Sequence, residues 1–149
     1  IIKGIATKED AILAVEHGVE VIYVSNHGGR QLDFGLGGLK VLPEIVDAIG
    51  KDATIFFDGG IMRGTDVVKA LSLGADIVGV GRLQGLAAAA GGSAAIYRML
   101  ELLELEIITC LRLLGVNDIA DLNSTNLTKD ESFGSLDVLS AFPLIKEGY

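Results

Sequence analysis

Residues 18–33, with the sequence GVEVIYVSNHGGRQLD, decide the fold class of this chain. After Gly18, residues 19–24 form a run that is apolar on both faces, which predicts a strand inside a parallel sheet. The run leads into a polar loop rich in glycine, and residues 74–82, GADIVGVGR, repeat the same order of features. Repeated units of strand, glycine-bearing loop and helix predict an α/β protein, either a doubly wound sheet or a (β/α)8 barrel.

The remainder of the chain continues the alternation of short apolar runs and amphipathic segments. The spacing predicts strands at 1–4, 19–24, 54–57 and 76–80, and helices at 8–17, 38–49 and 65–73. A long amphipathic helix is expected from near Ser93 to Leu114, with Gly115 as its end. We therefore expect a structural unit over 1–115 and a more polar surface tail over 116–149, which ends in the apolar piece 139–145.

The composition fits one soluble domain and excludes several classes of protein. Of 149 residues, 50% are hydrophobic, which argues against a disordered chain. A net charge of −8 argues against broad binding to nucleic acid or to an anionic membrane surface. The longest uncharged stretch, residues 83–97, is too short to span a membrane. The single Cys110 excludes an intrachain disulfide framework and is expected in the core.

The first residues, IIKGI, contain no basic leader followed by a long apolar region, and the chain does not begin with Met. They do not have the pattern of a signal peptide. We expect the chain to start inside a longer, soluble and intracellular protein, with the compartment left open.

In both candidate architectures, functional residues gather at the carboxyl ends of the strands. After the second predicted strand, His27 is suited to accept a proton and Arg30 to bind a carboxylate through two parallel hydrogen bonds. The alternative is a histidine that only hydrogen-bonds its loop, but a Gly-Gly-Arg sequence at a strand end favours a functional role. His17, at a helix C-terminus, is instead expected to be a solvated cap.

Two further strand-end loops suit a phosphate group. Residues 58–65, DGGIMRGT, and 79–82, GVGR, each place glycine and arginine before a helix, where backbone N–H groups are free. The alternative is glycine in tight turns and arginine in surface ion pairs. The Gly79-Val80-Gly81 spacing does not match a dinucleotide-binding fingerprint. Lys3, at the end of the first strand, has a fixed charge that suits an anion forming on a cofactor.

Together these motifs closely resemble the FMN-dependent α-hydroxy acid oxidase and dehydrogenase family, which includes glycolate oxidase, lactate oxidase, mandelate dehydrogenase and flavocytochrome b2. The resemblance covers about residues 1–115 and is carried by residues 3–5, 25–33, 58–60, 63–67 and 81–82. It implies the C-terminal half of a (β/α)8 barrel, from the end of strand five through helix eight. The N-terminal half is then expected from a second chain or from a missing part of the protein.

The resemblance also implies roles for individual residues. His27 resembles the catalytic base, Arg30 the ligand of the substrate carboxylate, and Lys3 the lysine near flavin N1 and O2. One departure is Met62, where the family usually has arginine, so that one phosphate salt bridge is lost or Arg63 replaces it in part. The remaining residues that match FMN contacts are Ser25, Asp58, Gly59, Gly60, Arg63, Gly81 and Arg82.

The reaction implied by the resemblance is oxidation of a small L-2-hydroxy acid to a 2-oxo acid with reduction of FMN. The sequence leaves open whether a carbanion or a hydride is involved, and whether oxygen or another acceptor reoxidises the flavin. No metal is expected at the site, and a homo-oligomer is expected from the family. The alternative is a non-catalytic phosphate-binding or assembly half-barrel, which Met62 and the short chain favour.

Overall fold

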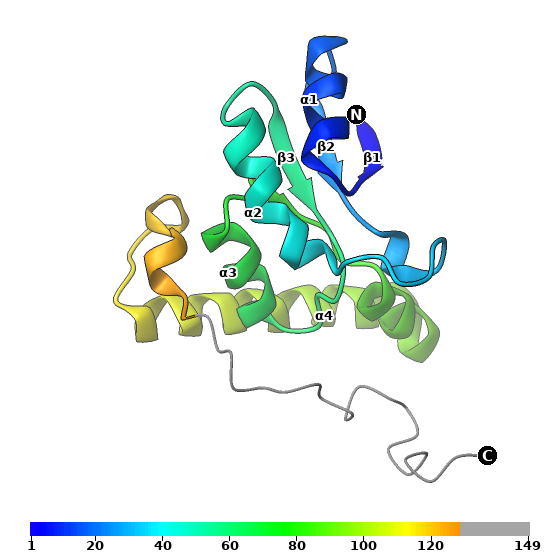
Figure 1. Ribbon diagram of the computed structural model, residues 1–149. Helices are drawn as coiled ribbons and strands as arrows, with labels where there is room; N and C mark the ends of the chain where they lie inside the picture. The colour runs from blue at the N-terminus through cyan, green and yellow to red at the C-terminus, as the bar shows by residue number, and fades with distance from the viewer. Residues whose placement is uncertain (129–149) are drawn as a thin grey trace, which may run out of the picture.

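A computed structural model describes residues 1–128 of the chain (Figure 1). In this part of the chain, a parallel sheet is surrounded by helices that follow its strands in sequence. The elements in chain order are β1 (Ile2–Ile5), α1 (Lys8–Glu16), β2 (Val21–Val24), η1 (His27–Gly29), α2 (Gly38–Ile49), β3 (Thr54–Phe57), α3 (Gly64–Ser72), β4 (Ile77–Val78), α4 (Arg82–Leu114), η2 (Ile119–Asp121) and η3 (Ser124–Asn126).

The order of the strands distinguishes between the two architectures that the sequence allows. The sheet has the order β1-β2-β3-β4, and every neighbouring pair is parallel. A doubly wound sheet reverses its strand order at a switch point, whereas a barrel adds each new strand on the same side of the last. The uniform order therefore indicates a segment of a (β/α)8 barrel, with β1 and β4 as its edges.

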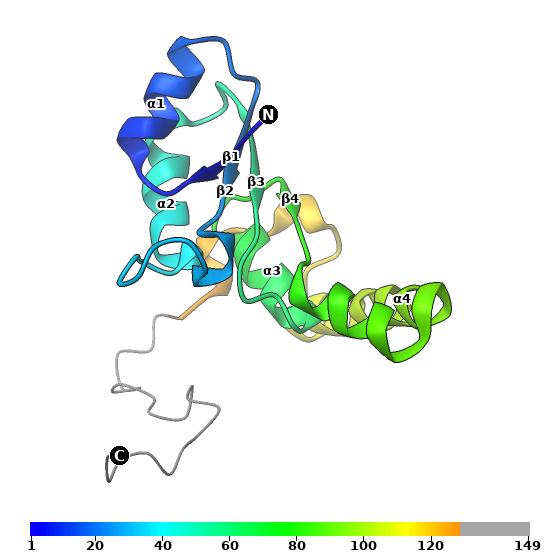
Figure 2. The same cartoon turned by 90° about the vertical axis from the view of Figure 1, so that its right-hand side faces the viewer.

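The two faces of the sheet differ in burial. Side chains that point toward α1 and α2, which lie together on one side of the strands in Figure 2, are at most 1% exposed: Ile22, Val24, Ile55 and Phe57. Burial of each contributes about 1.5–3 kcal/mol to folding. The strand register places another row, Lys3, Tyr23, Phe56 and Ile77, on the opposite face, where Ile77 is 48% exposed. In a closed barrel this second face is the interior.

Helix α4 differs from the expected one. It begins at Arg82 rather than near Ser93, because residues 87–90 are all alanine, the strongest helix former. At Gly91 and Gly92 the backbone leaves the helical conformation (φ −168° and 60°), so the helix bends there. The expectation that Cys110 lies in the core is wrong, since Cys110 on α4 is only half-buried. No helix within residues 1–128 combines the length and hydropathy needed to cross a membrane.

Other boundaries move by a few residues. The strands expected at 19–24 and 76–80 are shorter, as β2 (Val21–Val24) and β4 (Ile77–Val78). After Gly115, which ends α4 in the left-handed conformation, the chain turns back and η3 contacts α3. The apolar piece 139–145 lies outside the described residues.

Helices α3 and α4 pack together closely at Gly64. A Cβ atom on Gly64 would lie 2.5 Å from Glu106 Cβ and 2.7 Å from the backbone nitrogen of Ile107. Only a residue without a side chain fits at this distance from backbone atoms. Gly64 thereby sets the position of α4, whose first turn carries Arg82 toward the carboxyl ends of the strands.

Candidate functional site

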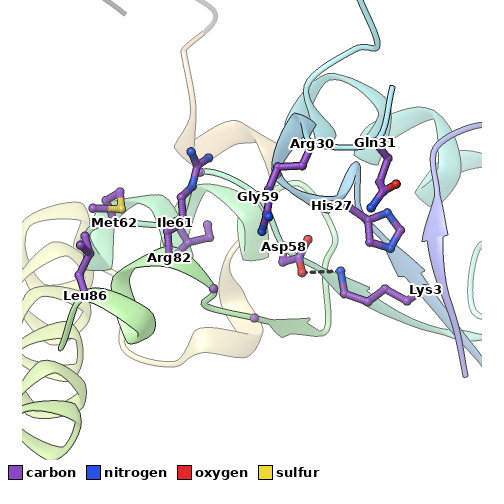
Figure 3. Close-up of a pocket in the computed structure, with 14 residues that line it drawn as sticks. Lys3, His27, Arg30, Gln31, Asp58, Gly59, Ile61, Met62, Arg82 and Leu86 are labelled. Atoms are coloured by element: carbon purple, nitrogen blue, oxygen red, sulfur yellow. Dashed lines mark ion pairs between the residues drawn. The ribbon is translucent and has the colours of Figure 1, made fainter. Parts of the chain in front are cut away.

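A cavity of about 850 Å3 lies at the carboxyl ends of the strands (Figure 3). Its volume lies within the range of small-molecule and cofactor sites. The structure thus brings together residues from β1 and from the segments that follow β2, β3 and β4, as the sequence predicts. The cavity is lined by Lys3, His27, Gly28, Arg30, Gln31, Asp58, Gly59, Gly60, Ile61, Met62, Gly79, Gly81, Arg82 and Leu86.

Lys3 is held by two partners from neighbouring strands. Its Nζ lies 2.7 Å from Oδ2 of Asp58 and donates a hydrogen bond to Ser25 Oγ at 2.7 Å. The hydroxyl of Ser25 in turn donates to Asp58 Oδ1. The ammonium also lies over the ring of Tyr23, 4.5 Å from its centroid, in cation–π geometry. These contacts fix a positive charge at the cavity wall and join the ends of β1, β2 and β3.

The same contacts determine protonation. Burial alone would raise the pKa of Asp58, but hydrogen bonds from Lys3 and Ser25 and the charge of Lys3 outweigh it, so the pKa lies below its ordinary value. Burial, the charge of Asp58 and a hydrogen bond to it raise the pKa of Tyr23. Near neutral pH, Asp58 is therefore ionised and Tyr23 is neutral.

The loop after β2 has an unusual backbone conformation. His27, Gly28 and Gly29 all have positive φ angles, of 55°, 72° and 71°. A positive φ is uncommon for a residue other than glycine, and such strain persists where surrounding contacts impose it. Two side chains supply those contacts: Asn26 Oδ1 accepts the N–H of Gly28 at 3.1 Å, and Ser25 Oγ accepts the N–H of His27 at 3.1 Å. The loop is preorganised with the imidazole of His27 facing the cavity (Figure 3).

Two arginines supply positive charge inside the cavity. Arg82 is the first residue of α4, where backbone N–H groups are free to bind an anion. Its Nη2 lies 3.9 Å from the position that a Cβ on Gly28 would occupy, so the loop after β4 reaches the loop after β2. Neither Arg82 nor Arg30 forms an ion pair within residues 1–128. Both charges are therefore available to an anionic ligand.

Arg63 lies elsewhere. Its Nε donates to Glu106 Oε1 at 2.7 Å, while Glu106 Oε2 accepts the N–H of Gly64 at 2.6 Å. The hydrogen bond from Gly64 and the contacts with Arg63 hold the pKa of Glu106 below its ordinary value. Met62, which is 44% exposed, lines the cavity and Arg63 does not. This geometry does not support the idea that Arg63 replaces the arginine missing at position 62.

The sequence prediction of the site was incomplete in both directions. Ser25 is 2% exposed and lies behind the cavity lining, although it was expected to contact the cofactor directly. Tyr23 was missed, and its two-residue spacing from Ser25 on a strand is the pattern that indicates it. Gln31 adjoins Arg30 in the lining, and Leu86 was missed because no helix was expected before Ser93.

The strand order and the cationic cavity define the chain as part of a (β/α)8 barrel protein with a site for an anionic ligand. The sequence profile of the FMN-dependent dehydrogenases matches residues 1–129. The chain belongs to this family of FMN-dependent hydroxy acid oxidoreductases, and FMN is the family's cofactor. This confirms the resemblance found in the sequence.

Curated relatives include oxidases and dehydrogenases. The chain is 45% identical over 129 residues to an L-lactate oxidase of Nostoc sp., covering 85% of this chain and 35% of the relative. It is 43% identical over 129 residues to an L-lactate dehydrogenase of Caulobacter vibrioides, covering 87% of this chain and 34% of the relative. The chain thus spans about a third of the length of these relatives.

Solved structures confirm the partial barrel. Mandelate oxidase bound to a substituted hydroxy acid ester superposes with a TM-score of 0.77 at 45% identity, covering 79% of this chain and 36% of that one. A double mutant of flavocytochrome b2 with pyruvate bound superposes with a TM-score of 0.82 at 43% identity, covering 85% and 34%. Another mandelate oxidase structure contains an FMN adduct.

The residues of the cavity fit FMN. Arg82 and the first turn of α4 suit its phosphate, and the backbone at Gly59 and Gly60, with φ of 120° and 75°, leaves room for a chain of hydroxyl groups. The ammonium of Lys3 suits the end of a flavin that becomes negative on reduction. The departure is Met62, which brings no charge to the cavity.

Proposed function

We propose that this chain forms the FMN- and substrate-binding half of an enzyme that oxidises an L-2-hydroxy acid to a 2-oxo acid. The observation that carries the proposal is the shared cavity: His27, Arg30 and Lys3 line it together although they come from separate segments. The relatives named L-lactate oxidase and L-lactate dehydrogenase support the substrate class. Because both names occur at similar identity, reoxidation by oxygen or by another acceptor is compatible with the proposal.

In this proposal, each cavity residue has one task. Arg30 binds the substrate carboxylate through its planar guanidinium and so orients the α-carbon. His27 accepts one of the two protons that the substrate loses, either from the α-carbon or from the hydroxyl. FMN, when bound, is the acceptor of the two electrons. Lys3, Asp58, Gly59, Gly60, Gly81 and Arg82 hold the cofactor.

The proposal includes completion of the barrel. Four strands do not close a barrel, and the inner face carries apolar groups such as Ile77, which is 48% exposed. We expect the remaining strands from the N-terminal half of the same barrel, as one polypeptide or as a second chain. Exposed leucines on α4, for example Leu105 at 57%, support a further homo-oligomeric contact. We call the chain together with the remainder of its barrel the assembled enzyme.

One observation favours the second candidate, a phosphate-binding or assembly half-barrel without catalysis. Met62 brings no positive charge to the cavity, and Arg63 is bound to Glu106. This candidate predicts that ligand binding occurs without turnover. His27 and Arg30 favour the enzyme, because neither supports the scaffold through any ion pair in the described residues.

The test is product formation by the assembled enzyme after reconstitution with FMN. Glycolate, lactate and mandelate are supplied with oxygen or a dye as acceptor, and the corresponding 2-oxo acid is measured. His27→Gln is expected to lower kcat by about 100- to 10,000-fold, the usual contribution of a general base. His17→Gln is the matched control, because His17 is exposed at the end of α1. FMN binding without product from any 2-hydroxy acid would support the second candidate.

A further inference from the structure

The described residues of the catalytic loop show how His27 is oriented, and this inference rests on the proposed function. We propose that Ser25 and Gly4 are positioning residues for His27, Ser25 through the backbone and Gly4 through the imidazole. Neither acts on substrate in this proposal. Ser25 was expected to contact flavin, and Gly4 has no assigned role.

Ser25 is a three-way junction. Its hydroxyl donates to Asp58, accepts from Lys3 Nζ at 2.7 Å and accepts from the backbone N–H of His27 at 3.1 Å. A hydroxyl has one donor and two acceptor sites, so these three bonds use its full capacity. Because the side chain is 2% exposed and its donor is committed to Asp58, it has none left for a ligand. What it does is hold the N–H of a residue whose φ is 55°.

Gly4 lies directly beside the imidazole. A Cβ atom on Gly4 would be 2.6 Å from His27 Cε1, a distance that real Cβ atoms do not adopt. The strand register shows why Gly4 faces this way: Lys3 pairs with Tyr23 and Ile5 with Val24, so Gly4 is the extra residue of a β-bulge. Bulges redirect the chain and often lie beside active sites. The bulge thus presents the bare backbone of Gly4 as a flat seat for the ring.

These two contacts account for the orientation of His27 within the described residues. None of the hydrogen bonds in this part of the chain involves an imidazole nitrogen of His27. The ring is therefore placed by its backbone, which Ser25 holds, and by contact with Gly4. Loss of either contact is expected to misplace the base without changing its chemical identity.

The first test uses Ser25→Ala in the FMN-saturated assembled enzyme. We expect kcat to fall about 10- to 100-fold, the effect of displacing a catalytic group by about 1 Å, while KM and the Kd of FMN stay nearly unchanged. Ser25→Thr retains the hydroxyl and is expected to restore most of the loss. A rise in the Kd of FMN with unchanged kcat at saturation would overturn the proposal in favour of a flavin contact.

The second test separates the seat from backbone strain. Gly4→Ala combines a positive φ of 101° with the collision, whereas Gly18→Ala has a φ of 78° and nothing within 4 Å of the added atom. We expect Gly4→Ala to lose kcat and Gly18→Ala to keep it. Equal losses in the two variants would contradict a specific role for Gly4. If Gly4→Ala does not fold, the following measurement still decides.

The third test needs no turnover. The chain has two histidines, so the assembled enzyme with 13C-labelled histidine gives two Hε1 signals, and His17→Gln assigns them. We expect a nuclear Overhauser effect between His27 Hε1 and the Hα protons of Gly4, and its loss in Ser25→Ala. Its absence in the wild type, or its persistence in Ser25→Ala, would overturn the proposal. If this effect behaves as expected while no hydroxy acid is oxidised, the proposed function fails and the positioning of His27 stands.

Discussion

Lys3 and Asp58 form an ion pair that spans the end of β2: Nζ of Lys3, on β1, lies 2.7 Å from Oδ2 of Asp58, which follows β3. The carboxylate therefore neutralises much of the lysine charge before any ligand binds. Arg30 and Arg82 remain as the unpaired cations of the cavity among the described residues. An anionic ligand is thus attracted mainly by the two arginines, and Lys3 acts at a fixed position.

Replacement of Lys3 is expected to change the acid titration of Asp58. Since the pKa of Asp58 is lower in the folded chain than its ordinary value of about 3.9, Asp58 stabilises the fold above that pH, and this stabilisation is lost as the pH falls through the folded pKa. Lys3→Met removes the partner, so the pKa rises and the contribution shrinks. NMR titration of the Asp58 carboxyl carbon measures the change. Lys40→Met, at an exposed site, is the control, and an equal shift in it would contradict the assignment.

Met62→Arg is expected to tighten FMN binding about 3- to 10-fold, because it adds a charged hydrogen-bond donor at a partly exposed position of the cavity. Riboflavin, which lacks the phosphate, should bind equally well to both proteins. Fluorescence titration with each flavin measures the two constants, and Met62→Leu controls for packing. A similar gain with riboflavin would show that phosphate is not the group involved.

Arg30→Lys is expected to raise the KM for the hydroxy acid about 10- to 100-fold, since lysine keeps the charge but cannot form two parallel hydrogen bonds to a carboxylate. Steady-state kinetics with saturating FMN measures it. Arg63→Lys is the matched control, because Arg63 is bound by Glu106 and does not line the cavity. An unchanged KM in Arg30→Lys would exclude Arg30 from carboxylate binding.

Gly64→Ala is expected to destabilise the assembled enzyme by about 1–3 kcal/mol, as overpacking does, because the added Cβ meets backbone atoms of α4. Gly85→Ala, also in α4 but with nothing within 4 Å of the new atom, should be neutral or stabilise by up to about 1 kcal/mol. Urea unfolding of both variants compares them. A neutral Gly64→Ala would mean that α3 and α4 are farther apart than the structure shows.

Much of the fold could be predicted because the decisive features are local. The βα order follows from apolar runs and glycine stops, as at Gly18 and Gly74, which both take positive φ after a helix. The residues of the strand-end loops could be predicted as neighbours because parallel strands bring their carboxyl ends together. The resemblance to the family then identified the roles.

What the sequence did not predict depends on contacts between distant segments. The pairing of Arg63 with Glu106 joins residues 43 positions apart, and nothing in either local sequence indicates it. The burial of Ser25 behind the cavity depends on Lys3 and Asp58 reaching it from two other strands. The early start of α4 is a different case, since the alanines before Gly91 were a local indication that was not used.

The most direct test of the central claim is the visible absorption spectrum of the assembled, FMN-reconstituted enzyme, recorded before and after anaerobic addition of glycolate, lactate or mandelate. If the cavity holds FMN and His27 and Arg30 act on a 2-hydroxy acid, the oxidised-flavin bands bleach with at least one of the three compounds. A flavin that binds but stays oxidised with each of them, or a protein that takes up no FMN at all, would contradict the account.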